Sequence, residues 1–467
     1  MGVKNSRKKA FRLGPGKKRF RAFTEVRMLL GTLGIRKSVV VGGIALLALV
    51  AMSLPGEAGV KPGDFITPDN SSQVKDLVSP GVFYRVQHGM TMKIVPTVRV
   101  DWPPPYKDAT EKYSSQVQLS KDHRTVVGYV AGQPFPLIDA NDPDVATKVV
   151  WNNVFRPIQS DDYDLRYFDC DTVYSGYNKP FFEIAYGQLG HYAGYDLVGR
   201  TEVEPLPIDP DFKKTNRLWL FLLGPELAPQ DARGTSLLRY RYADPAHGDD
   251  TWTWQTGSRR LRRLNEAINS SATGAQTWDP DHYSGFNPKT EQYNYKFLGE
   301  KEMLATVDAE HSPEVRCATD GGASACPERW QMRHMYIVTA EPRRIMGGEG
   351  AAAAIDSKTV IYMDSEMWFE PYIDTYDRKG ELFRNHVYWL AYRDRPVPDA
   401  KVAIYPFKRE FVVGASSQDV QSSEATMCYL PGIETPEREC WYINMGAVDR
   451  AFFTTEAMVK MSEVGHM

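Results

Sequence analysis

Two short segments place acidic residues beside a histidine, a combination that supports proton transfer or metal binding. The segments contain Asp308, Glu310 and His311, and Asp279, Asp281 and His282. Neither has a third ligand at helical spacing, so we interpret both as loop residues. The sequence also lacks G-x-S-x-G, H-E-x-x-H, Walker and C-x-x-C motifs. We therefore predict a protein that is not an enzyme and holds no metal and no cofactor.

A basic run is the most unusual local feature. It contains the four arginines Arg259, Arg260, Arg262 and Arg263. Guanidinium groups at this density can bind phosphates or carboxylates. The alternative is a solvated strand whose charges pair with nearby acids. We take the four arginines as candidate contacts for an anionic headgroup or for a partner.

The five cysteines suggest two local disulfides. Cys317 lies close to Cys326, and Cys428 lies close to Cys440, with Gly- or Pro-rich loops between them. Each bridge would contribute roughly 2–3 kcal/mol and requires an oxidising compartment. Cys170 is then expected to be free and buried. The alternative is five reduced core thiols.

The N-terminus has the pattern of a targeting segment. Residues 1–37 carry 12 Lys or Arg and one acid, whereas the whole chain has a formal net charge of −3. The uncharged run Ser38–Leu54 follows, and small residues after it favour cleavage before Gly59. The alternative is an uncleaved inner-membrane anchor, and either Met1 or Met28 can start the chain. We predict a periplasmic protein, and the acidic remainder disfavours a nucleic-acid partner.

Hydrophobic periodicity divides the chain into three parts. Residues 1–58 are the basic leader and signal peptide. Residues 59–112 are a polar leader with short helices, the first of which ends at Pro80. Residues 113–467 form one domain with apolar residues at a period of two, which predicts strands. The predicted strands are Tyr113–Leu119, Thr125–Val130, Phe181–Tyr186, Leu197–Val203, Leu218–Leu223, Ser236–Tyr242, Thr251–Gln255, Tyr293–Leu298, Arg333–Thr339, Lys358–Met363, Met367–Ile373 and Glu381–Tyr392.

These elements predict a mainly β (α+β) fold with one large, curved antiparallel sheet and a few covering helices. One helix is expected after the Asp142-Pro143 cap, and a tight turn at Asp377–Gly380. Leu218–Leu223 is apolar on both faces, so it is either buried on both sides or lines an internal cavity. Aromatic residues make up 12% of the chain, which is typical of sheets and apolar cavities. The candidate lining residues are Trp219, Phe221, Leu223, Trp254, Trp368 and Trp389, with ordinary core packing as the alternative for each.

Several longer strings resemble an uncharacterised family of exported proteobacterial proteins related to the LolA/LolB lipoprotein carriers. The strings lie at residues 128–136, 239–245, 250–260, 376–380 and 439–446, and the resemblance extends from about Lys61 to about Val459. It implies an incomplete, strongly curved antiparallel barrel, closed by helices around an apolar cavity for acyl chains. It implies no catalytic or binding residue.

Three functions are compatible with this pattern. The first is a periplasmic carrier or chaperone for a hydrophobic cargo, such as lipid or lipoprotein acyl chains, that serves an envelope exporter or outer-membrane protein. The second is a non-catalytic structural or adaptor protein of an envelope export system. The third is a hydrolase with an unrecognised site. A continuous apolar cavity would favour the first over the second, and a buried acid–histidine pair opening into it would favour the third.

Overall fold

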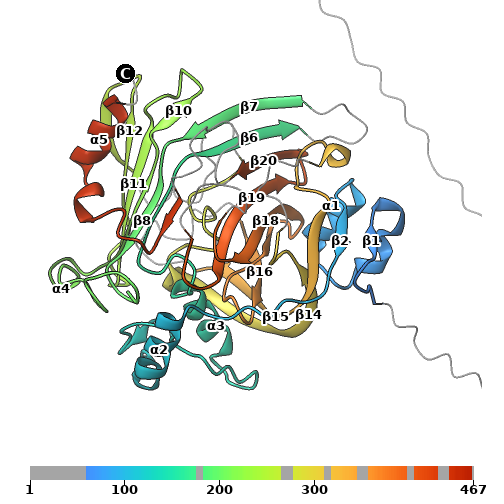
Figure 1. Cartoon of the computed structure of the whole chain (residues 1–467), viewed down its shortest axis with the longest axis horizontal. Helices are drawn as coiled ribbons and strands as arrows, with labels where there is room; N and C mark the ends of the chain where they lie inside the picture. The colour runs from blue at the N-terminus through green and yellow to red at the C-terminus, as the bar shows by residue number, and fades with distance from the viewer. Residues whose placement is uncertain are drawn as a thin grey trace, which may run out of the picture. The chain divides into compact units, whose positions relative to one another are not determined.

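Two mainly antiparallel sheets form the framework of the chain (Figure 1). The computed structural model describes residues 59–174, 182–264, 277–309, 317–343, 356–396, 404–429 and 441–464. The larger sheet has the order β1 (Phe65–Ile66), β2 (Met92–Ile94), β15 (Glu328–Pro342), β16 (Lys358–Asp364), β17 (Tyr372–Tyr376), β18 (Leu382–Arg393), β19 (Arg409–Asp419), β20 (Glu424–Tyr429), β6 (Phe168–Tyr174), β7 (Phe182–Leu189) and β10 (Glu226–Ala228), with β14 (Tyr293–Ala305) also paired to β15. Of these described pairs, β2–β15 is parallel and the others are antiparallel.

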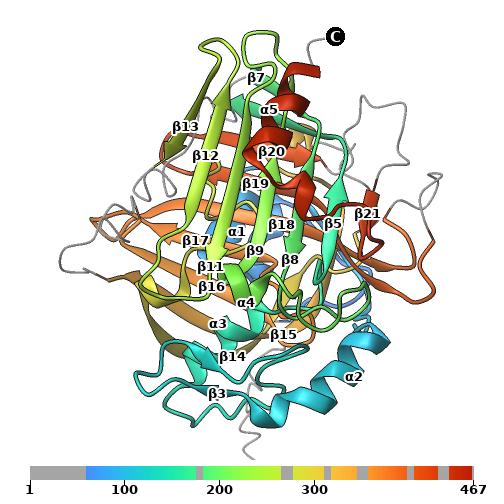
Figure 2. The same ribbon diagram turned by 90° about the vertical axis from the view of Figure 1, so that its left-hand side faces the viewer.

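The smaller sheet crosses in front of the larger one when viewed as in Figure 2. Its order is β13 (Arg260–Leu264), β12 (Asp250–Gln255), β11 (Ser236–Tyr242), β9 (Arg217–Leu223), β8 (Tyr192–Asp196), β5 (Asp162–Leu165) and β21 (Trp441–Ile443). A separate short hairpin pairs β3 (Gln118–Leu119) with β4 (Val126–Val127). These open, curved sheets confirm the predicted mainly β fold class.

The chain bends from one sheet into the other at three neighbouring places. β5 continues into β6, β7 into β8, and β9 into β10, each after a very short connection. The backbone N–H of Gly190 in one connection donates to the carbonyl of Pro225 in another, at 2.9 Å. The two sheets are therefore joined along one corner, and the space inside this corner is bounded on two sides by strands.

Helices cover the outer faces of the sheets. α5 (Thr455–Val464) packs on β11 and β12 (Figure 2) and buries Phe453 and Met458 against Trp254. α1 (Pro80–Gln87) packs on β17 and β18 of the larger sheet. The other described helices and 3-10 turns are α2 (Pro104–Tyr113), α3 (Val145–Val154), α4 (Phe212–Thr215), η1 (Pro68–Val74), η2 (Ser114–Gln116), η4 (Thr290–Gln292), η5 (Ala318–Asp320) and η7 (Arg450–Phe452).

Pro80 begins a helix and does not end one. Ser79 caps α1 by accepting a hydrogen bond from the Val82 backbone N–H at 3.2 Å, and proline suits the first helical position because its missing N–H is not needed there. Likewise, α3 begins at Val145 after Asp144, two residues later than the Asp142 cap predicts. Residues 59–112, predicted as a leader of short helices, also supply β1 and β2 to the larger sheet.

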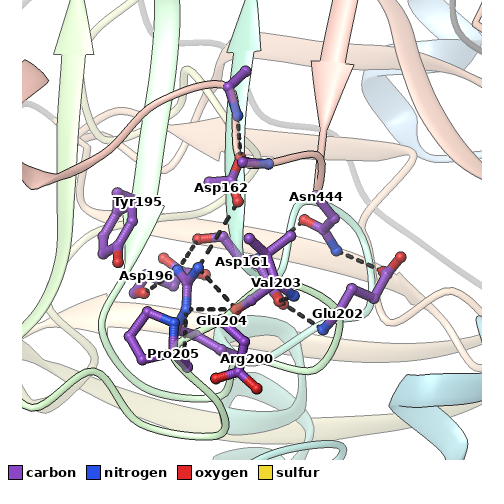
Figure 3. Close-up of polar contacts among 12 residues, drawn as sticks. Asp161, Asp162, Tyr195, Asp196, Arg200, Glu202, Val203, Glu204, Pro205 and Asn444 are labelled. Carbon is purple, nitrogen blue, oxygen red and sulfur yellow. Dashed lines mark hydrogen bonds and ion pairs between the residues drawn. The ribbon is translucent and has the colours of Figure 1, made fainter.

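The predicted strand Leu197–Val203 is wrong, because this segment is a loop held by a buried arginine (Figure 3). Arg200 is 1% exposed and donates to the backbone carbonyls of Asp161 and Asp196, each at 2.8 Å. The Asp161 carboxylate in turn accepts hydrogen bonds from the backbone N–H groups of residues 201–203. Those N–H groups bond to a side chain and not to a neighbouring strand, so the alternating pattern here does not produce a strand.

Three further strand predictions are too long or displaced. Helix α2 extends to Tyr113, so only β3 remains of the strand predicted from that residue. β4 is similarly short, and of the strand predicted at Met367–Ile373 only the last two residues lie in β17.

The structure corrects one of the two predicted disulfides. Cys317 and Cys326 are bridged as predicted, with a Cα–Cα distance of 4.7 Å. Cys428 is bridged to Cys170, whose Cα lies 4.1 Å away, so the predicted Cys428–Cys440 bridge is wrong and Cys170 is not free. Cys170 and Cys428 lie directly opposite each other on β6 and β20, strands that are far apart in sequence. Cys440 lies outside the described residues.

No helix among the described residues has both the length and the apolar character that crossing a bilayer requires. The predicted signal peptide, within residues 1–58, lies outside the described residues.

Candidate ligand cavity

A cavity of about 630 Å³ lies inside the corner where the sheets meet. One wall is a row of directly opposed residues on β5, β8, β9, β11 and β12. In order, the row contains Leu165, Tyr192, Leu223, Leu237 and Thr253. Directly opposed residues of an antiparallel sheet point to the same face, so strand pairing alone builds this wall.

The larger sheet supplies the opposite wall. Tyr388 of β18, Val412 and Ala415 of β19, and the Cys170–Cys428 disulfide all line the cavity. Trp278, from the segment that precedes β14, also lines it. The volume lies within the range of about 300–1,000 Å³ that is typical of small-molecule sites, and most of the named lining groups are apolar.

The cavity also contains two acidic residues. Glu226 of β10 and Asp231 both contribute to its lining. Burial, and secondarily the charge of Asp231, raise the pKa of Glu226 to about 7. A carboxyl that is largely protonated below neutral pH fits an apolar wall better than a permanent anion.

Three of the predicted lining residues lie on cavity walls. Leu223 lines the large cavity. Trp219 and Phe221, on the same strand β9, line a smaller cavity of about 80 Å³. Arg239 and Asp196 also line this smaller cavity, which is accordingly more polar. These three predicted residues alternate along β9, so they lie on the same face of the strand.

The other three predicted tryptophans pack elsewhere. Trp254 lies between Thr253 and Gln255, which line the cavity, and packs on the opposite face of β12 beneath α5. Trp368 stacks on Tyr336 with ring centroids 5.5 Å apart. Trp389 is 1% exposed and is adjacent to the cavity-lining Tyr388, so strand alternation directs it to the other face of β18.

Sequence reasoning missed Trp278 and Tyr388 as lining residues. The period of two correctly separates Tyr388 from Trp389. It does not show which face of β18 is internal. Trp278 had no local signal, because it lies outside the predicted strands.

The arginine run lies on the edge strand β13 and the turn before it. Arg259, in the turn, has a positive φ of 48°, and Arg260, Arg262 and Arg263 are exposed on β13. Arg262 is opposite Thr253, and Arg260 is opposite Gln255. Because Thr253 and Gln255 line the cavity, Arg260 and Arg262 lie on the cavity side of this edge.

Arg263 lies on the other face of β13. It is opposite Trp252 and forms an ion pair with Asp250. The single run therefore divides into two arginines on the cavity side and one paired on the outer side.

The two acid–histidine segments differ in their contacts. Asp308 pairs with Arg329 at 3.1 Å, and Glu310 and His311 lie outside the described residues. Asp279 and His282 form a buried pair, with 2.9 Å between Asp279 Oδ1 and His282 Nδ1. The neighbouring residues Trp278, Tyr283 and Ser284 line the cavity, but this pair does not.

The architecture thus defines a class of protein with open, curved antiparallel sheets around an apolar cavity. Residues 65–458 match the family model described as "Protein of unknown function (DUF1329)", so the chain belongs to this family. This match confirms the resemblance to an uncharacterised family. A similar curated protein, uncharacterized protein PA3922 of Pseudomonas aeruginosa, is 22% identical over 356 residues, which span 73% of this chain and 72% of that protein.

Solved structures with similarity to this chain include three proteins. A putative outer membrane lipoprotein-sorting protein domain from Vibrio parahaemolyticus has 12% identity and a TM-score of 0.41, and the match covers 64% of this chain and 92% of that one. A DUF1329 family protein from Desulfovibrio piger has 14% identity and a TM-score of 0.39, with coverage of 64% and 92%. The LolA superfamily protein NE2245 from Nitrosomonas europaea has 11% identity and a TM-score of 0.33, with coverage of 63% and 91%.

Proposed function

We propose that this protein is a non-catalytic periplasmic carrier or chaperone that binds the acyl chain of a lipid or lipoprotein. The observation that carries the proposal is the cavity of about 630 Å³, whose walls present Leu165, Leu223, Leu237 and Val412. Each methylene group removed from water contributes about 0.8 kcal/mol. A long acyl chain therefore gains enough free energy from this cavity without any charged contact.

The two disulfides support a periplasmic location. Cys170–Cys428 and Cys317–Cys326 are both bridged, and such bridges persist in oxidising compartments such as the bacterial periplasm. The predicted signal peptide agrees with this location, and its cleavage before Gly59 is testable by N-terminal sequencing of protein from the envelope fraction. The partner that receives the cargo, an envelope exporter or an outer-membrane protein, belongs to the same proposal.

Filling the cavity should block uptake of an acyl chain. Leu237 is half-buried and lies between Leu223 and Thr253 in the cavity wall, so Leu237→Trp places a larger side chain in the space of the ligand. We expect the Kd for a fluorescent 16-carbon fatty acid to rise by about tenfold or more, the loss of roughly two buried methylenes. A titration of the protein with the fluorescent fatty acid at constant temperature measures this Kd.

Leu261→Trp is the matched control. Leu261 is 42% exposed on β13 and is opposite Trp254, on the face of the smaller sheet away from the cavity. This variant should bind the probe as the wild type does, and circular dichroism should show equal strand content in both variants. Equal binding by all three proteins, or no binding by the wild type, would contradict the carrier function and favour the adaptor function.

The cavity-side arginines should select for an anionic headgroup. We expect the double variant Arg260→Gln/Arg262→Gln to bind a fatty acid anion about threefold more weakly at low salt, because exposed ion pairs contribute up to about 1 kcal/mol. Binding of a fatty alcohol of the same length should not change. The matched control, Arg259→Gln/Arg263→Gln, removes the same charge from the turn and the outer face. A similar loss in both double variants would show a general charge effect and contradict headgroup selection.

A further inference from the structure

A buried cluster outside the cavity lining brings together two histidines and a carboxylate from distant parts of the chain. Asp279 and His282 precede β14, and His386 lies on β18. The exposed fractions are 1%, 5% and 0%. The rings of His282 and His386 are stacked, with centroids 4.6 Å apart and planes 1° apart. One ligand atom from each of the three residues lies within 4.8 Å of the other two.

Three of the four imidazole nitrogens of this cluster lack hydrogen-bond partners among the described residues. Neither ring nitrogen of His386 has a partner among the described residues, and neither does Nε2 of His282. Buried polar atoms without partners are rare and cost free energy, so three of them in one cluster require an explanation. A bound ion would accept one lone pair from each imidazole and so account for two of these three atoms.

The contact between Asp279 and His282 suits the same explanation. The carboxylate oxygens of Asp279 lie 2.9 and 3.0 Å from Nδ1 of His282. A carboxylate on one ring nitrogen fixes the tautomer and leaves the other nitrogen for a metal ion, as is common around metal-binding histidines. Asp279 can hold His282 in this way or turn one oxygen to the ion itself.

Carboxyl groups lie in and around the cluster. Asp279 and Asp281 are buried, and Asp356 lies next to His282. Arg384 lies 3.8 Å from Asp279, and Arg239 lies 3.1 Å from Asp281. Carboxylate oxygens therefore stand beside the imidazole nitrogens, and a divalent cation accepts both kinds of donor.

We propose that Asp279, His282 and His386 bind a divalent transition-metal ion of the zinc class. Two imidazoles and a carboxylate are a donor set that zinc accepts, with bonds of ~2.0–2.2 Å. Because the lone pair of an imidazole lies in the plane of its ring, at least one of the two stacked rings must tilt toward the ion for both to bind it. The ion would tie the segment that carries Trp278 and Tyr283 to β18. The inference concerns the stability of this segment and does not depend on the acyl-chain proposal.

The test uses the mature wild-type protein. After dialysis against a chelator, elemental analysis should show that added Zn²⁺ rebinds with a stoichiometry near one, and the melting temperature should rise by several degrees. Zinc X-ray absorption should show the outer-shell scattering of two imidazoles. Absence of rebinding, or a zinc spectrum without imidazole scattering, would overturn the proposal without any variant.

Variants locate the ion. His386→Gln should abolish both rebinding and the rise in melting temperature. The matched control is His334→Gln, because His334 is an exposed histidine whose ring nitrogens lie 3.0 Å from Glu300 and from Glu302, a plausible adventitious zinc site. Loss of the ion in His334→Gln with retention in His386→Gln would overturn the proposal. Should His386→Gln not fold, Asp279→Asn tests the same cluster, and the absorption spectrum of the wild type still decides.

Discussion

Replacing Cys170 by serine is expected to lower the free energy of unfolding by about 5 kcal/mol. The Cys170–Cys428 bridge spans 258 residues, and the loop entropy that a disulfide removes from the unfolded chain increases with the length of the loop. Both cysteines also line the cavity, so the variant should lose acyl-chain uptake as it loses stability. Denaturant unfolding followed by tryptophan fluorescence measures the change.

Two other cysteine variants test whether the loss of stability comes from breaking the Cys170–Cys428 bridge. Cys326→Ser opens a bridge with a sequence separation of 9 and should cost about 3 kcal/mol by the same relation. Cys440→Ser should leave stability almost unchanged, because Cys428 is already bonded to Cys170. The assignment is wrong if Cys440→Ser is as destabilising as Cys170→Ser, or if non-reducing peptide mapping links Cys428 to Cys440.

The predictable part of the fold is the part that local pattern controls. The strand predicted at Ser236–Tyr242 matches β11, and the strand predicted at Glu381–Tyr392 differs from β18 by one residue at each end. The hairpin turn at Asp377–Gly380 also occurs as expected, since Gly380 has a φ of 83° and its N–H donates to the Asp377 carbonyl. In each case a short-range signal, either alternation or a glycine at positive φ, agrees with the tertiary structure.

The unpredicted features depend on residues that are distant in sequence. Arg200 makes a loop from an alternating segment through Asp161, which lies 39 residues away. Cys170 finds its partner 258 residues away, and His282 meets His386 from another strand. Proximity in sequence, which favoured Cys440 for Cys428, contains no information on such contacts.

The candidate cavity was predictable in kind but not in detail. Leu218–Leu223 indicated a strand that contacts apolar groups on both sides, and Leu223 does line the cavity. The alternating pattern of β12 does not show which of its two faces lines the cavity. Thr253 faces the cavity and Trp254 does not, because α5 packs on the face that carries Trp254. The C-terminal helix covers the side of the sheet that carries the tryptophan, so the cavity receives the smaller, more polar neighbour.

The second large effect concerns pH and Glu410. This residue on β19 is 2% exposed, and neither carboxylate oxygen has a hydrogen-bond partner on another described residue. Burial, as the largest cause, raises its pKa from 4.5 to about 7, while its own backbone and the charge of Arg409 oppose the rise and the charge of Asp364 adds to it. Ionised Glu410 is therefore costly in the folded state.

The direction in which stability changes with pH follows from proton binding. Between pH 4.5 and about 7 the folded protein keeps the proton on Glu410 while the unfolded chain releases it. Folding thus binds protons, and the free energy of unfolding contributed by this residue falls as pH rises through this window. A pKa shift of this size corresponds to about 3 kcal/mol of unfolding free energy. The folded protein has lost this contribution once the pH exceeds about 7.

Glu410→Met should remove this dependence. Methionine has a similar length and no ionisable group, so the stability advantage of the variant over the wild type should grow by about 3 kcal/mol from pH 4.5 to pH 8. The other buried acids, such as Glu370, titrate equally in both proteins and cancel in the difference. Glu381→Met, at an exposed position next to the hairpin turn, is the control and should show a constant difference from the wild type. Denaturant unfolding at closely spaced pH values gives the comparison. An advantage of Glu410→Met that stays constant with pH would show that Glu410 already ionises normally in the folded protein.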